Sequence, residues 1–236
     1  TNGVGSTVSR EADHVLYTWA GPEIAVASTK AYTTQLLCLY MMALNFAEKM
    51  GRISEEKYRQ MLNEMKRLPD LAQIVLDNKQ IIQRCADETF NANSIFYIGR
   101  GLDYAVAMEG SLKLKEISYI HSEAYAAGEL KHGTIALIEE GTPVIAFATQ
   151  NKLFEKTLNN IKEVKARGAF VIAVAMEGNT EIEKEVDRVL YIPNTYNMLA
   201  PILMAIPLQL YAYYVAVARG CDVDKPRNLA KSVTVE

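Results

Sequence analysis

The sequence predicts an α/β protein with a parallel sheet flanked by helices. Four short apolar runs rich in Val, Ile, Phe and Tyr have the length and composition of buried strands; they lie at 94–99, 143–148, 169–174 and 188–192. Helical patterns separate these runs, and strands that alternate with helices form a parallel sheet covered on both faces. An internal repeat indicates that the chain contains two such units, one of which is incomplete.

The repeat aligns residues 12–43 with residues 186–217 without a gap. Its identical positions include the triplet Val-Leu-Tyr at 15–17 and 189–191 and the pair Gln-Leu at 35–36 and 209–210. An ungapped match of this kind indicates two copies of one structural unit.

The two copies predict equivalent helices at 24–44 and 198–218, both buried in a soluble domain. Because the second copy opens near Ser94, its partner would open well before Thr1. We therefore expect the first copy to be present only as its C-terminal end, and the chain to be a fragment.

Four segments are expected along the chain. They are the C-terminal part of a first module (1–47), a helical connection (48–92), a complete second module (93–220) and a C-terminal tail that folds over a site (221–236). In the connection, Pro69 is expected to end a helix that follows the N-cap Ser54, so that two helices form a hairpin. The second module should have helices at about 103–120, 152–167, 178–187 and 198–218.

Composition excludes several classes of function. With a net charge of −3 over 236 residues, the chain has no basic face for nucleic acid and no polybasic membrane signal. Its three cysteines are far apart and lack metal-ligand spacing, which indicates reduced thiols in a cytoplasmic protein and no metal site. The uncharged stretch 198–218 is long enough for a membrane span, but Pro201, Pro207 and the repeat favour a core helix.

Gly-Arg-Gly at 99–101 follows a strand and precedes a helix, where open α/β sheets bind ligands. The third glycine of a dinucleotide fingerprint would fall at Tyr104, so no dinucleotide site is expected. The motif either contacts another ligand or is a tight turn that requires glycine.

Glu109, Lys113 and Glu116 are spaced so that they share one face of the helix expected at 103–120. This pattern is typical of a solvated salt-bridge ladder, and it is also compatible with a proton-transfer site. Gly110 and Ser111 favour the second interpretation, because they suit close packing better than a solvated helix surface.

Two loop segments could also carry chemistry. His132 lies in a stretch, 123–133, expected to be a loop, and histidine titrates where proton transfer is useful, although a lone loop histidine is often simply exposed. Ser28 and Thr29 either cap the following helix or bind a sugar or phosphate there.

The C-terminal tail has features of a segment that folds back. Pro226 stiffens it, and its apolar side chains for burial are Leu229, Val233 and Val235. Arg227 and Lys231 are four residues apart, and a lysine can neutralise phosphate or form a Schiff base.

Three stretches resemble the glucosamine-6-phosphate synthase family: LKLKEISYIHSEAYAAGELKHG at 112–133, VASTKA at 26–31 and PRNLAKSVTVE at 226–236. The resemblance covers essentially the whole chain. It implies two flavodoxin-like sugar-isomerase (SIS) modules, and an enzyme without a cofactor that makes glucosamine 6-phosphate from fructose 6-phosphate and ammonia released from glutamine.

The resemblance also implies catalytic roles. Glu116 would move a proton between C1 and C2 of the sugar, with Lys113 as a supporting lysine. His132 would open and close the sugar ring, reaching the site from the neighbouring subunit of a homodimer. Lys231 would form a Schiff base with the ketose.

Val26 and Ser28 match sugar-contacting positions of the family. Arg227 matches an arginine in the family's C-terminal tail and is also expected to bind the substrate. The glutamine-hydrolysing domain and the phosphate loop of the first module are not in this sequence, so we expect the chain to be inactive alone. Loop 148–152 lacks the serine and glycine pattern of that phosphate loop.

Two alternatives remain open. The first is a sugar-phosphate isomerase that uses no ammonia, against which the tail with Lys231 argues. The second is a non-catalytic sugar-phosphate-sensing module, against which the joint presence of Glu116, Lys113 and His132 argues.

Overall fold

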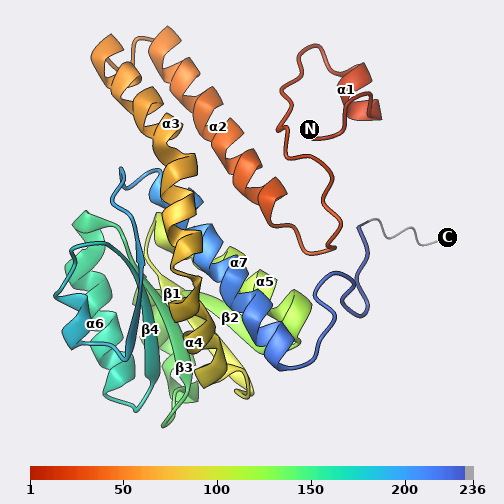
Figure 1. Ribbon diagram of the computed structural model, residues 1–236. Coiled ribbons are helices and arrows are strands. Elements are labelled where there is room, and N and C mark those ends of the chain that lie inside the picture. The colour runs from red at the N-terminus through yellow and green to blue at the C-terminus, as the bar shows by residue number, and fades with distance from the viewer. Residues whose placement is uncertain (232–236) are drawn as a thin grey trace.

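The computed structural model describes residues 1–231, and a five-stranded sheet forms its centre (Figure 1). The strands are β1 (Ser94–Gly99), β2 (His121–Ala126), β3 (Pro143–Ala148), β4 (Phe170–Met176) and β5 (Arg188–Ile192). Their order is β2-β1-β3-β4-β5, and every neighbouring pair is parallel. This is the flavodoxin-like order, so the predicted fold class is confirmed. Val233 and Val235 of the tail lie outside the described residues.

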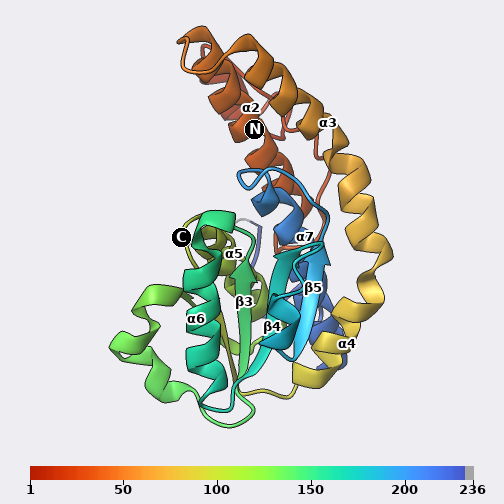
Figure 2. The same cartoon turned by 90° about the vertical axis from the view of Figure 1, so that its left-hand side faces the viewer.

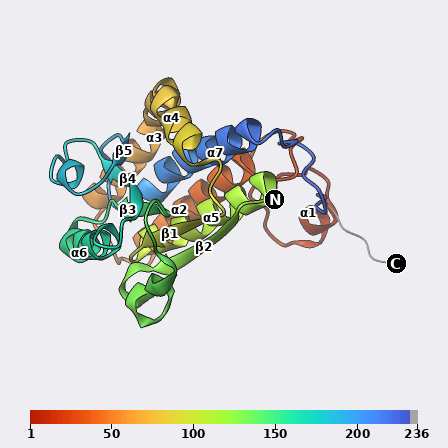
Figure 3. The same cartoon turned by 90° about the horizontal axis from the view of Figure 1, so that it is seen from below.

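Helices cover both faces of the sheet (Figure 3). One face carries α4 (Lys79–Thr89), α5 (Leu102–Ser118) and α7 (Ala200–Ala218). The other carries α6 (Phe154–Lys165) and the 3₁₀ turns η1 (Ala127–His132) and η4 (Ile182–Lys184). The remaining elements are α1 (Thr7–Glu11), α2 (Lys30–Lys49), α3 (Glu55–Asp77), η2 (Thr134–Leu137) and η3 (Asn151–Leu153).

The strands form the centre because both of their faces are apolar. All six residues of β3 are buried. In β1, Ile95 and Tyr97 join the core shared with α5 and α7, whereas Phe96 and Ile98 join the core shared with α6. This alternation is the two-residue period of a strand, and a sheet covered on both sides needs it on every central strand.

Close packing fixes how α5 lies between the sheet and α7. A Cβ atom on Gly110 would stand 2.8 Å from Cδ1 of Leu208 on α7 and 3.0 Å from the ring of Tyr97. Ser111 is also buried, and its hydroxyl lies 3.1 Å from that of Ser122 on β2. The small size of Gly110 and Ser111 therefore allows α5 to pack closely, as these residue types predict.

The edge strand β2 was not predicted. Its residues, His121–Ala126, overlap the segment expected to be a loop, yet they pair in parallel with β1 from Ser94↔His121 to Gly99↔Ala126. Among them, Ser122 alone is buried. An edge strand with so little burial does not need an apolar run, which is why its polar sequence gave no strand signal.

The helical connection differs from the predicted hairpin. α3 continues through Pro69 to Asp77, and α4 follows after Asn78. Leu68 and Leu71, on either side of the proline, are buried in the core, and burial of such side chains offsets the cost of about 3 kcal/mol of an internal proline. The antiparallel pair is formed instead by α2 and α3 (Figure 2).

The equivalent helices of the two repeat copies differ in burial. α2 begins at Lys30 rather than near residue 24, and none of its residues is buried, whereas its counterpart α7 is largely buried. The triplet at 15–17, which matches β5, is not a strand. The expectation of a second buried helix is therefore wrong for this chain, because α7 packs on the sheet and, among residues 1–231, α2 has no such sheet.

Two further expectations concern helices of the second module. The helix expected at 178–187 is only the short turn η4. α7 is long and apolar enough to cross a membrane, but 67% of its apolar window is buried inside the protein. It is the central helix of the larger core, as the repeat predicts.

The turn between β1 and α5 yields a stability prediction. A Cβ on Gly99 would lie 2.7 Å from backbone atoms of Asp103 and Tyr104, so Gly99→Ala should displace the first turn of α5. We expect it to lower the free energy of unfolding by roughly 1–3 kcal/mol, measured by urea denaturation. Gly3→Ala is the control, because its Cβ would meet only Ser6 at 3.6 Å. Equal effects of the two substitutions would contradict the prediction.

Candidate active site

Glu109, Lys113 and Glu116 form a charged triad on α5. Nζ of Lys113 lies 2.6 Å from Oε2 of Glu116 and 3.6 Å from Oε1 of Glu109. The Lys113 side chain is only 5% exposed, and those of Glu109 and Glu116 are 13% and 20% exposed. A solvated ladder has much higher exposure, as in the pair Arg59–Glu55 on α3, where both side chains exceed 70%. The triad is therefore not a solvated ladder.

One ammonium group serves two carboxylates in this triad. Burial raises the pKa of Glu109, the charge of Lys113 lowers it in part, and the charge of Glu116 raises it again. Glu116 is the closer partner of Lys113 and the more exposed of the two carboxylates. One charge-assisted hydrogen bond leaves a carboxylate with free lone pairs, so Glu116 is oriented and can still accept a proton.

A second carboxylate, Glu23, organises the start of α2. Its Oε1 accepts hydrogen bonds from the amides of Thr29 (2.8 Å) and Ala31 (3.3 Å) and from the hydroxyl of Thr29 (3.1 Å). These amides are among the free N–H groups of a helix N-terminus. Burial acts to raise the pKa of Glu23, but these bonds and the ammonium of Lys231 together lower it to about 2. Glu23 is thus a fixed negative charge at neutral pH.

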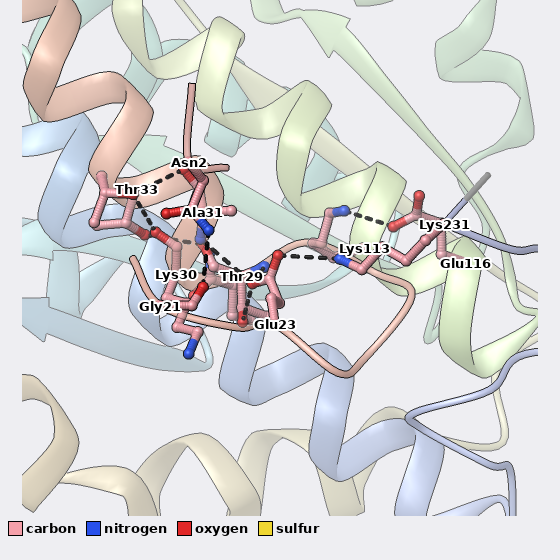
Figure 4. A network of polar contacts seen from close by, with 12 residues as sticks. Asn2, Gly21, Glu23, Thr29, Lys30, Ala31, Thr33, Lys113, Glu116 and Lys231 are labelled. Carbon is pink, nitrogen blue, oxygen red and sulfur yellow. Dashed lines mark hydrogen bonds and ion pairs between the residues drawn. The ribbon is translucent and has the colours of Figure 1, made fainter. Parts of the chain in front are cut away.

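The C-terminal tail reaches this carboxylate. Nζ of Lys231 lies 3.1 Å from Oε2 of Glu23, and their side chains are 42% and 8% exposed. Figure 4 shows this pair in the same close-up as Lys113 and Glu116. The structure thus places the lysine of the tail on the loop before α2, 208 residues away in the sequence.

Val26 and Ser28 lie in the same loop, before α2 rather than inside it. Both residues are half-buried. The Val26 amide donates to the carbonyl of Asp224 in the tail over 3.0 Å, and the side-chain amide of Gln209 on α7 donates to the carbonyl of Thr29. The loop is therefore held between the tail and α7, with Ser28 beside these contacts.

Arg227 lies at the C-terminal end of α5. Its guanidinium carbon is 4.1 Å from the centre of the Tyr119 ring, and its backbone amide donates to the Tyr119 hydroxyl over 2.8 Å. Tyr119 directly follows α5 in a left-handed conformation. In the described part of the chain no contact joins Arg227 to the triad, so it attaches the tail to the end of this helix.

His132 is separated from the triad by the sheet. It is exposed at the end of η1, which is anchored by Ala127 and Leu130 in the core shared with α6. Glu116 lies on α5, which packs on the opposite face of the sheet. Within one chain, His132 therefore does not join Glu116.

Internal hydrogen bonds join Asp103 of α5 to Thr149 at the carboxyl ends of β1 and β3. Asp103, only 1% exposed, accepts bonds from the amide of Thr149 (2.9 Å) and from its hydroxyl (2.6 Å). Burial raises the pKa of Asp103, although these bonds lower it in part. Gly101 has a φ of 59° at the start of α5, so Gly-Arg-Gly forms a turn that requires glycine.

Sequence reasoning missed Glu23 and Asp103. Glu23 lies six residues before Thr29, outside the spacing of a capping box, so no local pattern identifies it. Asp103 binds Thr149 across 46 residues, and only the packing of β1 against β3 brings the two together.

The site offers an oriented carboxylate, Glu116, and a primary amine, Lys231. Among residues 1–231, no group of three or more His, Cys, Asp or Glu side chains could hold a metal ion. A carboxylate can move protons and an amine can form an imine with a carbonyl compound.

Fold and site define a doubly wound α/β domain that carries a carboxylate–lysine pair and a lysine on a returning tail. The SIS domain family matches residues 1–45 and 88–219. The chain belongs to that family, and the match includes both copies of the internal repeat.

Known proteins support the resemblance found in the sequence. A glutamine–fructose-6-phosphate aminotransferase (isomerizing) of Caldanaerobacter subterraneus subsp. tengcongensis is 69% identical over 236 residues, which are 100% of this chain and 39% of that protein. The solved C-terminal domain of glucosamine-fructose-6-phosphate aminotransferase from Francisella tularensis has a TM-score of 0.89 at 38% identity, covering 95% of this chain and 63% of that one. The chain spans about two fifths of the length of the curated relatives that it matches.

The triad yields a second stability prediction. Lys113→Met leaves Glu109 and Glu116 without a partner in a poorly solvated place, and we expect it to lower the free energy of unfolding by roughly 2–4 kcal/mol. The control is Arg59→Met, which breaks an exposed pair and should cost less than about 1 kcal/mol. Chemical denaturation measures both. A Lys113→Met variant as stable as the control would contradict the buried ion-pair arrangement.

Proposed function

We propose that this chain is the isomerase part of a glutamine–fructose-6-phosphate aminotransferase. In this proposal it converts fructose 6-phosphate and ammonia to glucosamine 6-phosphate in amino-sugar biosynthesis, in the cytoplasm and as a homodimer. The names of its relatives support the proposal. The observation that carries it is the Glu116 carboxylate held at 2.6 Å by the buried Lys113.

The first chemical step is assigned to Lys231. Its neutral amine adds to the C2 carbonyl of the open-chain sugar, and water leaves as the imine forms. Ammonia then takes the place of the lysine on C2, which frees the amine of Lys231 and leaves the sugar as its own C2 imine.

The second step is assigned to Glu116. It takes a proton from C1 and returns it at C2, while the C1 hydroxyl loses its proton as the aldehyde forms and the imine nitrogen gains one to become an amine. One carboxylate can serve both adjacent carbons, and such positioned proton transfer contributes about 10²–10⁴-fold in rate. Lys113 keeps the carboxylate in place and its charge stabilises the negative charge that develops on the substrate.

Ring opening is assigned to His132 of the partner subunit. The sheet separates His132 from Glu116 within one chain, which supports assigning this role to His132 of a second copy. Histidine titrates near neutrality, which suits an acid–base group that both gives and takes a proton.

Binding of the sugar is assigned to residues of the loop before α2 and of the tail. The Val26 amide is already bonded to Asp224, so its carbonyl is the group left for a sugar hydroxyl, and the Ser28 hydroxyl can donate or accept. Arg227 would supply a cation for the sugar phosphate. That role requires its guanidinium to leave the ring of Tyr119.

Proton exchange tests the role of Glu116. The test protein is a chimera in which these 236 residues replace the matching part of the 69% identical relative, so that the remaining part of such an enzyme is present. We expect the chimera to exchange the C2 hydrogen of glucosamine 6-phosphate in heavy water, and Glu116→Gln to slow this exchange at least about 100-fold, measured by NMR. Glu55→Gln, at an exposed position of α3, is the matched control and should exchange normally.

Several outcomes would contradict this proposal. If a folded chimera binds glucosamine 6-phosphate but does not exchange its C2 hydrogen, the chain is a non-catalytic sugar-phosphate-sensing module. Unchanged exchange in Glu116→Gln would move the base to another residue.

Subunit mixing tests the origin of His132. Chimeras with Glu116→Gln or His132→Asn should each lose synthesis of glucosamine 6-phosphate from fructose 6-phosphate. Equal mixtures that exchange subunits should recover about one quarter of the unsubstituted rate, because half of the dimers then contain one intact site of two. No recovery after verified subunit exchange would show that both residues act from the same chain.

A further inference from the structure

We propose that Glu23 is the positioning residue for Lys231: from the loop before α2, its carboxylate holds the amine of the tail where the sugar carbonyl arrives. The inference rests on the imine-forming role proposed for Lys231. It adds a residue from the first copy of the repeat to a reaction whose other groups lie mainly in the second copy and the tail.

The geometry of Glu23 suits this role because its two oxygens have different partners. Oε1 is bonded to Thr29 and Ala31 at the N-terminus of α2, and Oε2 is bonded to Lys231. The carboxylate is therefore fixed by the helix on one side and presents its second oxygen to the tail on the other (Figure 4).

Burial divides the pair into a fixed and a movable partner. The Glu23 side chain is 8% exposed, whereas that of Lys231 is 42% exposed. A free lysine side chain samples many rotamers, and an anchored counter-charge restricts where its amine lies before substrate binds. The other tail contacts, from Asp224 to Val26 and from Arg227 to Tyr119, hold the tail but not the amine.

Glu23 does not act as the base that deprotonates Lys231. Three hydrogen bonds from the start of α2 and the ammonium of Lys231 keep its pKa far below that of an ordinary glutamate. A carboxylate so stabilised as an anion accepts protons poorly at neutral pH. Its contribution is the location of the amine, and the amine must lose its proton and part from Glu23 before it attacks the carbonyl.

Imine trapping tests this inference in the chimera described above. Borohydride delivers hydride to the imine carbon and fixes fructose 6-phosphate on Lys231, and peptide mass spectrometry gives the rate of labelling. Exchange of the C2 hydrogen of glucosamine 6-phosphate, which needs Glu116 but no imine on Lys231, is measured in parallel. Glu23→Gln removes the charge, Glu23→Asp keeps it on a shorter side chain, and Glu55→Gln is the matched surface control.

We expect Glu23→Gln to lower the trapping rate roughly tenfold more than the exchange rate, as loss of one charge-assisted hydrogen bond would. Glu23→Asp should recover part of the loss, and Glu55→Gln should change neither rate. Equal losses in trapping and exchange would mean that Glu23 only maintains the fold, and this would overturn the inference. Faster or unchanged trapping in Glu23→Gln would also overturn it, because the pair would then restrain the lysine or be irrelevant to it.

The proposed function fails in a different way. If the unsubstituted chimera neither traps the sugar nor exchanges its C2 hydrogen, the roles of Lys231 and Glu116 are wrong, whatever Glu23 does. If it exchanges the hydrogen but Lys231 is never labelled, the imine role alone is wrong, and the positioning role of Glu23 fails with it.

Discussion

The packing of α5 between the sheet and α7 is the constraint on which the candidate site depends. Gly110 lets α5 approach Leu208 of α7 and Tyr97 of β1 more closely than any residue with a side chain would allow. The same approach places Lys113 where only 5% of its side chain meets water. A lysine in such a place needs carboxylate partners, and the helix supplies one at each neighbouring turn. Close helix packing is thus combined with an ion pair that holds the Glu116 carboxylate in one orientation.

The internal repeat explains why one sequence pattern has two structural outcomes. α7 lies on the sheet and is largely buried, whereas its counterpart α2 leaves apolar side chains such as Leu39 and Phe46 more than half exposed. α2 nonetheless lies close to α5 of the second unit. Burial and the charge of Glu109 raise the pKa of Tyr32 on α2 to about 12, which reflects the proximity of this helix to α5. The site is therefore composed of parts from both copies, and neither copy supplies it alone.

Local sequence pattern located strands β1, β3, β4 and β5 but missed the polar edge strand β2. Strands β1 and β3 have the predicted bounds, because a strand buried on both faces must be a continuous apolar run. The edge strand β5 also has its predicted bounds, since its sequence is apolar enough to bury Leu190 and Ile192. β2 was not predicted because an edge strand can be polar. Pro69 does not end α3 as expected, because burial of its apolar neighbours stabilises the continuous helix. Glu116 and Lys113 could be found from their spacing and the family resemblance. Glu23 could not, since its role arises from a contact 208 residues away.

The two lysines of the site differ in a way that matches two kinds of chemistry. Lys113 is buried and lies 2.6 Å from Glu116, an arrangement that fixes the direction of the carboxylate. Lys231 is half-exposed, sits on a tail and is held by one oxygen of a carboxylate that is itself anchored elsewhere. Proton transfer between adjacent carbons requires a base that does not move, whereas imine formation requires an amine that leaves its partner and bonds to carbon. The different burial of the two pairs follows from their places in the fold, one inside a packed helix face and one where the end of the chain meets the loop before α2.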